Sequence, residues 1–115
     1  MTRILCIDEN VEILKLYGEI LKDYEIVVTQ SPVDGYDKLC QNGIDLVITE
    51  LLFENTFDGN MFISQVRQEG YKGPIIVSSY RAPNGQKEKN IRILQKPFSC
   101  RELKDLVNEL MTSKK

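Results

Sequence analysis

Acidic, hydroxyl and ammonium side chains stand at the ends of four short apolar runs in this 115-residue sequence. Each run has the length and the apolar, β-branched content of a buried strand. Parallel strands bring their carboxyl ends to one edge of a sheet, where open α/β sheets build their sites. The sequence therefore predicts one crevice that gathers Asp8, Glu9, Glu50, Ser79 and Lys96.

Carboxylates outnumber cations in this predicted crevice. Three carboxylates against one ammonium give it a formal charge of −2, and acids of like charge repel unless something cationic joins them. A hard divalent ion with oxygen ligands is the natural partner, and Mg²⁺ takes one or two carboxylates together with waters. Lys96 could also pair with Glu50, and Ser79 could donate a hydrogen bond to an anionic oxygen.

The elements that must position these residues alternate along the chain. Apolar runs rich in β-branched residues predict strands over about 3–7, 24–29, 44–50, 75–79 and 91–95. Apolar residues at helical spacing predict helices over about 11–22, 32–41, 60–70 and 100–112. Such alternation makes a parallel sheet with right-handed crossovers and helices on both faces.

Local signals mark where the helices begin and which side faces the core. Asn10 and Ser31 can each cap a helix start, and Ser99 with Glu102 forms a capping box. Every helix carries an apolar stripe; in the third helix the core residues are expected to come from Met61, Phe62, Ile63 and Val66.

Two of the connecting segments are predicted to be loops. Residues 51–59 end in the turn pair Asp58-Gly59. Residues 80–90 contain Pro83 and Gly85, which oppose a long helix. We therefore expect a shortened or irregular fourth helix, with at most a short helical turn in that segment.

Composition narrows the class of protein. Hydrophobic residues make up 42% of the chain and charged residues 28%, as in an ordinary globular domain. A net charge of −2 gives no reason to expect nucleic-acid binding. No apolar run approaches the roughly 20 residues of a membrane span, and the first residues lack the apolar segment of a secretory signal. We expect a cytoplasmic domain without a membrane partner.

Histidine and cysteine usage argues against several kinds of site. The sequence has no histidine, which removes the commonest general base and metal ligand. Its cysteines, Cys6, Cys40 and Cys100, are odd in number and fall in three different elements. We expect free, buried thiols instead of a disulfide or a zinc site.

Five segments, taken in order, resemble the motifs of bacterial response-regulator receiver domains: 4–9, 44–50, 58–59, 74–79 and 94–98. One such segment would be a weak signal, whereas five at compatible spacing on this strand–helix pattern are specific. The resemblance covers essentially the whole chain and implies one receiver-like domain over residues 1–115. It also implies an α/β fold, a single (βα)5 doubly wound parallel sheet with five strands in the flavodoxin-like order 2-1-3-4-5.

The resemblance assigns the acidic residues to metal binding and phosphorylation. Asp8 and Glu9 match the acidic pair that holds Mg²⁺ in the family. Glu50 and the backbone carbonyl of Leu52 would complete that metal site. Glu50 also stands at the phosphoacceptor position.

Two further residues match the positions that contact the phosphoryl group in the family. Ser79 matches the switch hydroxyl, and Lys96 matches the lysine that reaches the phosphoryl group. The family usually has a cis peptide bond before the following proline, so we expect one between Lys96 and Pro97.

Three departures from the family pattern bear on function. The phosphoacceptor is an aspartate in the family, and the extra methylene of Glu50 moves its carboxylate by roughly 1.5 Å. In-line phosphoryl transfer depends on positioning at that scale. Lys96 follows Ser79 by 17 positions, so the fourth crossover is short. The aromatic switch residue that many members carry three positions before the lysine is Ile93 here.

We therefore expect an atypical stand-alone receiver domain, not an enzyme, that acts mainly as a phosphorylation-independent protein-interaction module. Glu50 would hold Lys96 in an arrangement partly like the phosphorylated state, although a phosphate carries more charge and more acceptor oxygens. A protein partner would bind through residues 80–95 and the C-terminal helix. Mg²⁺ binding would be weakened or absent, and the domain would be a monomer or a weak homodimer.

Other interpretations stay open at this point. The domain could still accept a phosphoryl group from a histidine kinase in a phosphorelay. A flavodoxin-like ligand binder or enzyme is less favoured, because no glycine-rich phosphate loop follows the first strand. Glu50 could also be an ordinary strand-end acid paired with Lys96, and Asp8 with Glu9 could be an exposed pair at a helix N-terminus.

Overall fold

A five-stranded parallel sheet forms the centre of the computed structural model, which describes residues 2–41, 43–51, 59–80, 88 and 90–112. The strands are β1 (Arg3–Ile7), β2 (Glu25–Thr29), β3 (Leu46–Thr49), β4 (Ile75–Ser79) and β5 (Ile91–Gln95). They lie in the order β2-β1-β3-β4-β5, and each neighbouring pair is parallel. The predicted strand order is confirmed.

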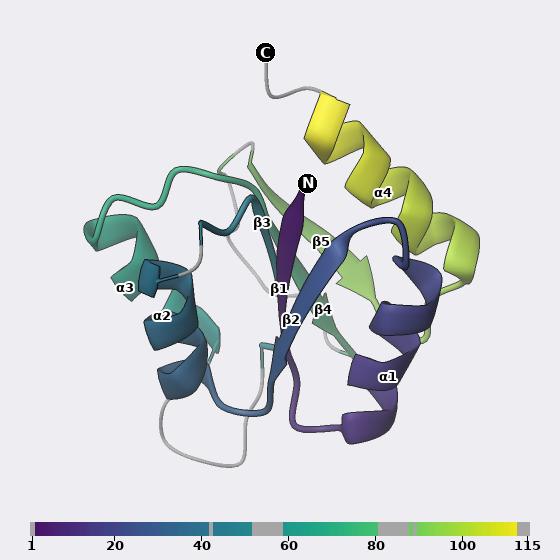
Figure 1. Ribbon diagram of the computed structural model, residues 1–115, viewed down its shortest axis with the longest axis horizontal. Coiled ribbons are helices and arrows are strands. Elements are labelled where there is room, and N and C mark those ends of the chain that lie inside the picture. The colour runs from purple at the N-terminus through teal and green to yellow at the C-terminus, as the bar shows by residue number, and fades with distance from the viewer. Residues whose placement is uncertain (1, 42, 52–58, 81–87, 89, 113–115) are drawn as a thin grey trace.

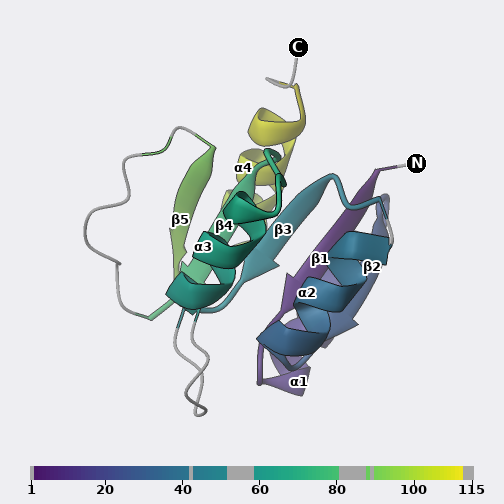
Figure 2. The ribbon, with the colours of Figure 1, turned by 90° about the vertical axis from the view of Figure 1, so that its left-hand side faces the viewer.

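Four helices cover the two faces of this sheet in the part of the chain that the structure describes. On one face lie α1 (Val11–Ile20) and α4 (Cys100–Thr112), and on the other α2 (Pro32–Gln41) and α3 (Gly59–Gln68), as Figure 1 shows. Figure 2 looks onto the face that α2 and α3 cover. The doubly wound α/β architecture is therefore confirmed. None of the described helices is long and apolar enough to cross a membrane.

The fourth crossover connects β4 to β5. The structure describes only residues 80, 88 and 90 of the segment 80–90. The predicted shortened or irregular helix therefore lies largely outside the described residues.

Two apolar cores, one on each face of the sheet, hold the interior strand β1. Successive side chains of a strand point to opposite faces. Ile4 and Cys6 accordingly pack with residues of α1 and α4, whereas Leu5 and Ile7 pack with the core on the α3 side. All four are at most 1% exposed. Burying a side chain of the size of Leu or Ile stabilises a fold by about 1.5–3 kcal/mol, so the strand that precedes Asp8 is firmly anchored.

Hydrogen bonds at the helix starts follow the capping signals in the sequence. The Asn10 side chain accepts a hydrogen bond from the backbone N–H of Glu12 at 2.9 Å. The Ser99 hydroxyl accepts from the backbone N–H of Glu102 at 3.1 Å, and the Glu102 carboxylate accepts from the backbone N–H of Ser99 at 3.0 Å. The predicted cap of α1 and the predicted capping box of α4 are confirmed.

Three predictions of burial are wrong. Met61 is 50% exposed, and Cys40 and Cys100 are exposed, so Cys6 is the buried thiol of the three. Met61 lies on the far side of the helix from the arc that faces the sheet, an arc made by Phe62, Ile63 and Val66. Cys40 and Cys100 stand near helix ends on the solvent side, where a small apolar residue is tolerated.

Candidate functional site

The register of β1 and β3 places Asp8 and Glu50 at the same level of the sheet. Ile7 of β1 pairs with Thr49 of β3, so the residue after each strand follows at the same edge. The backbone N–H of Glu50 donates to the carbonyl of Ile7 at 2.9 Å, which extends the ladder one residue past β3. Both carboxylates therefore leave the sheet side by side, at its carboxyl edge (the lower edge in Figure 1).

Lys96 reaches the same edge from the other half of the sheet. Ser79 of β4 pairs with Gln95 of β5, and the backbone N–H of Lys96 donates to the Ser79 carbonyl at 2.8 Å. The Lys96–Pro97 peptide bond is cis, as expected. Ser79, expected to supply a hydroxyl at this edge, is only 1% exposed.

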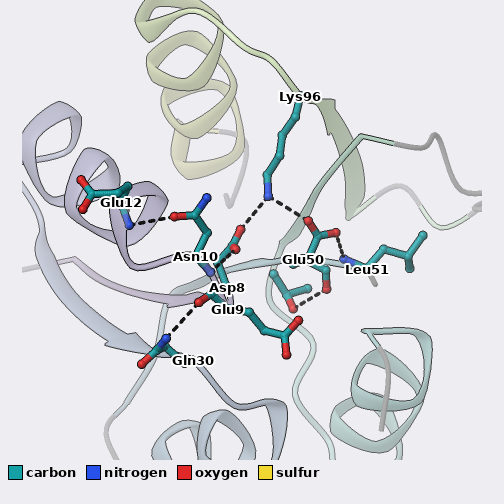
Figure 3. A network of polar contacts seen from close by, with 9 residues as sticks. Asp8, Glu9, Asn10, Glu12, Gln30, Glu50, Leu51 and Lys96 are labelled. Atoms are coloured by element: carbon teal, nitrogen blue, oxygen red, sulfur yellow. Dashed lines mark hydrogen bonds and ion pairs between the residues drawn. The ribbon is translucent and has the colours of Figure 1, made fainter. Parts of the chain in front are cut away.

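The Lys96 ammonium lies between the two carboxylates (Figure 3). Its Nζ donates to Asp8 Oδ2 at 2.7 Å and to Glu50 Oε1 at 2.8 Å. Asp8 is 3% exposed, Lys96 5% and Glu50 8%, so the ions are held largely away from water. The predicted Glu50–Lys96 pair is confirmed. The contact between Asp8 and Lys96 was not predicted.

Burial and pairing act in opposite directions on the protonation of Lys96. Desolvation alone would lower the pKa of the ammonium. The hydrogen bonds to Asp8 and Glu50, with the negative charges of these groups, outweigh that effect and raise the pKa of Lys96 above its ordinary value. Lys96 is therefore a cation at neutral pH, and it belongs to a cluster with one positive and two negative formal charges.

Glu50 is held through both of its carboxylate oxygens. Oε1 accepts from Lys96, and Oε2 accepts from the backbone N–H of Leu51 at 2.6 Å (Figure 3). The Thr49 hydroxyl donates to the carbonyl of Glu50 at 3.0 Å. Because charge-assisted hydrogen bonds are among the strong ones in proteins, the contacts of Oε1 and Oε2 fix the orientation of the carboxylate.

Aromatic packing braces the segment that follows Lys96. The rings of Tyr17 in α1 and Phe98 are stacked, with centroids 5.9 Å apart and planes 2° apart. Tyr17 is 1% exposed, and burial raises the pKa of its hydroxyl. An offset aromatic pair contributes about 0.5–1.5 kcal/mol beyond its buried area. The stack ties α1 to the loop that carries Lys96.

Glu9 differs from its neighbour Asp8 in its surroundings. Its side chain extends away from the Lys96 ammonium in Figure 3, and its backbone carbonyl accepts a hydrogen bond from Gln30 Nε2 at 2.9 Å. Glu9 is partly exposed, whereas Asp8 is buried. The two adjacent acids are therefore not equivalent members of the site.

Two of the acidic side chains expected to bind Mg²⁺, those of Asp8 and Glu50, are arranged around the Lys96 ammonium. Within the described ranges, no three side chains of Asp, Glu, Cys or His gather closely enough to hold a metal ion. An ammonium occupies the space between Asp8 and Glu50, so the side chains as placed do not fit a metal ion there. Leu52 lies outside the described residues. The metal-binding roles of these residues and of Glu9 stay predictions.

Tyr80 is a further neighbour of the cluster, and it was not predicted from the sequence. Its ring centroid is 5.4 Å from Lys96 Nζ, within the range of a cation–π interaction. Tyr80 as a whole is 66% exposed. One signal could have found it, because Tyr80 directly follows Ser79, at the edge of the sheet where the charged residues gather.

The sequence matches the model of a protein family over most of its length. The model of the response regulator receiver domain family matches residues 4–108. This chain belongs to that family. Receiver domains are modules of two-component signalling that interact with histidine kinases and other proteins, and they are not typically enzymes. Receiver domains generally bind Mg²⁺ at the acidic phosphorylation site.

This receiver domain is similar in sequence to part of a longer signalling protein. Hybrid signal transduction histidine kinase D of Dictyostelium discoideum is 29% identical over 125 residues. The match covers 97% of this chain, and the chain spans about 8% of the length of that kinase.

Solved structures share the fold of this receiver domain. A response regulator receiver protein of Sinorhizobium medicae has a TM-score of 0.88 at 23% identity, with 99% of this chain and 97% of that chain covered. Chemotaxis protein CheY4 of Vibrio cholerae has a TM-score of 0.86 at 19% identity, with 96% and 98% covered. At these identities the likeness establishes the common fold.

Proposed function

We propose that this receiver domain works mainly as a phosphorylation-independent protein-interaction module, with Glu50 at the phosphoacceptor position. The observation that carries the proposal is the buried Lys96 ammonium, held by Asp8 at 2.7 Å and by Glu50 at 2.8 Å. The lysine thus has two anionic partners without any phosphoryl group. The Glu50 side chain would act as a permanent, partial substitute for the phosphorylated residue.

The geometry of Glu50 disfavours its attack on a phosphodonor. In-line phosphoryl transfer depends on a well-placed nucleophile, and the extra methylene of glutamate displaces the carboxylate by roughly 1.5 Å relative to aspartate. Its two oxygens accept from Lys96 at 2.8 Å and from the Leu51 backbone at 2.6 Å. These contacts would have to weaken before either oxygen could react.

The charge of the cluster acts in the same direction. Asp8 and Glu50 bring two negative charges and Lys96 brings one positive charge, all in residues that are at most 8% exposed. An anionic phosphodonor would approach a site whose formal charge is already negative. Like charges at short range in a partly desolvated site repel more strongly than in water.

We place the partner surface on residues 80–95 and α4. Tyr80 and Ile93 expose 66% and 39% of their surface, and aromatic and apolar residues are typical of the centre of protein–protein interfaces. Arg92 of β5 pairs with Glu109 of α4, which ties the edge strand to the helix. A protein with apolar side chains opposite Tyr80 and Ile93 would fit this surface. Without it, we expect a monomer or a weak homodimer.

A second candidate function is phosphoryl transfer in a phosphorelay. Similarity to a hybrid signal transduction histidine kinase favours it, as do Asp8, Ser79 and Lys96, which sit together at the carboxyl edge of the sheet. In this case a kinase histidine would donate the phosphoryl group and Glu50 would accept it despite its length.

Intact-mass spectrometry after incubation with acetyl phosphate and Mg²⁺ distinguishes the two functions. The wild type would be compared with Glu50→Asp and with Glu50→Gln, which has no carboxylate to modify. Glu12→Asp makes the same chemical change on α1 in a side chain that is 81% exposed, so it serves as a matched control.

The proposal expects a phosphoryl group only on Glu50→Asp. The shorter side chain restores the in-line position, whereas the wild type and the two other variants stay unmodified. A phosphoryl group on the wild type that Glu50→Gln abolishes would reject phosphorylation independence and favour the relay function, because Glu50 would then accept a phosphoryl group. If Glu50→Asp is not modified either, the rest of the pocket is no longer competent.

A further inference from the structure

Tyr80 stands on the open side of a site whose ionic groups are buried. It follows the last residue of β4, and 66% of its surface is exposed, whereas Lys96 is 5% exposed. The Lys96 Nζ lies 5.4 Å from the centroid of the Tyr80 ring. One face of the ring therefore covers the ammonium while much of the side chain contacts solvent.

The donors of Lys96 explain why an aromatic ring suits this position. An ammonium has three N–H donors, and two of them serve Asp8 and Glu50. The face of an aromatic ring is electron-rich and attracts the remaining positive charge without being a third anion. A third carboxylate would add repulsion to the two already present, whereas a purely aliphatic side chain would offer no electrostatic attraction.

We propose that Tyr80 is a gate for Lys96: its ring shields the ammonium, and it must turn away before an anionic group can reach that nitrogen. Tyr80 is in this sense a positioning residue, since it keeps Lys96 on Asp8 and Glu50. The gate would help to keep phosphodonors away from the site, and in this respect the inference rests on the proposed function. Its physical basis, the contact between ring and ammonium, is independent of phosphorylation.

The gate can be tested by the chemical reactivity of the lysine, without metal or phosphodonor. A brief treatment of the whole chain with a low concentration of acetic anhydride acylates lysines according to the accessibility of the amine and to the fraction of it that is unprotonated. Peptide mass spectrometry then gives the rate at Lys96 relative to Lys15, whose side chain is 67% exposed and serves as an internal reference.

The variants separate the ring from the hydroxyl and from simple bulk. Tyr80→Ala and Tyr80→Leu remove the aromatic face and should raise the relative rate at Lys96 by about two- to five-fold, the factor expected for a cation–π contact at a partly exposed site. Tyr80→Phe keeps the face and should react like the wild type. Since Tyr80 is largely exposed, all three variants should keep the fold, which thermal unfolding would check.

Three results would overturn the gate: an unchanged rate in Tyr80→Ala, an unchanged rate in Tyr80→Leu, or a rise in Tyr80→Phe as large as that in Tyr80→Ala. These results are distinguishable from a failure of the proposed function. A phosphorylated wild type would reject phosphorylation independence and leave the labelling ratios as they are. An unchanged labelling ratio would leave the outcome of the Glu50→Asp experiment untouched.

Discussion

Replacing Lys96 by methionine removes the cation from the buried cluster and keeps most of the length of the side chain. Asp8 and Glu50, 3% and 8% exposed, would then face each other as two carboxylates without the ammonium that joins them. Removing one partner of a buried ion pair costs about 3–5 kcal/mol. Folded domains are stable by only about 5–15 kcal/mol, so Lys96→Met should remove a large share of the stability.

Urea and thermal unfolding followed by circular dichroism measure this loss. For a domain of this size, the loss corresponds to a decrease in Tm of about 10–20 °C. The matched control is Lys15→Met, because Lys15 Nζ lies 3.9 Å from Glu12 in an exposed pair. Exposed pairs contribute about 0–1 kcal/mol, so the control should unfold close to the wild type.

A second substitution tests the physical cause of the loss. Adding Glu50→Gln to Lys96→Met removes one of the two like charges, so the double variant should recover about 1–2 kcal/mol relative to Lys96→Met. A loss below about 1 kcal/mol in Lys96→Met would refute the view that the cluster depends on its cation. A double variant less stable than Lys96→Met would show that repulsion between the carboxylates is not what destabilises it.

Two further predictions concern pH and close packing. The pKa of Lys96 in the folded state is raised above its ordinary value of 10.5. The contribution of Lys96 to the stability of the fold is therefore fully present below pH 10.5, and it is lost only as the pH rises through the folded pKa. The difference in unfolding free energy between wild type and Lys96→Met should therefore be constant from about pH 7 to pH 10; a decline within that range in urea titrations would contradict the sign of the shift. The second prediction concerns Gly35→Ala, which would place a Cβ 2.5 Å from Ile7 Cδ1. The overpacking should lower the unfolding free energy by about 1–3 kcal/mol, which outweighs the gain of about 1 kcal/mol in helix propensity. In an Ile7→Val background, which lacks that methyl group, Gly35→Ala should be neutral or stabilising in the same unfolding assay. Equal losses of stability in both backgrounds would rule out the steric cause.

Local signals in the sequence determined the elements and their order. Helix caps such as Asn10, and the Ser99–Glu102 box, act between residues two or three positions apart, so they can be recognised without knowing the fold. Strand ends could be placed in the same way, because an apolar run stops where a polar residue begins. Alternating elements then imply a parallel sheet, and its carboxyl edge predicts which side chains meet.

Side-chain exposure within an element was harder to predict. Met61, Cys40 and Cys100 are apolar or weakly polar and lie on helices, yet they are exposed. Hydrophobicity alone gives a preference for the core, whereas the arc of a helix that faces the sheet depends on how the helix docks. For α3 that arc begins at Phe62, one residue after Met61.

The pairing inside the site was decided by the tertiary structure. Lys96 contacts Asp8 across 88 positions of sequence and Glu50 across 46. The distance to Glu50 depends on the registers of β3 with β4 and of β4 with β5, and the distance to Asp8 depends also on the register of β1 with β3. The strand–helix alternation was enough to predict that these charges gather at one edge. Only the folded sheet decided that one ammonium bridges both carboxylates and that Tyr80 covers it, because hydrogen bonds and cation–π contacts require positions set to within about an ångström.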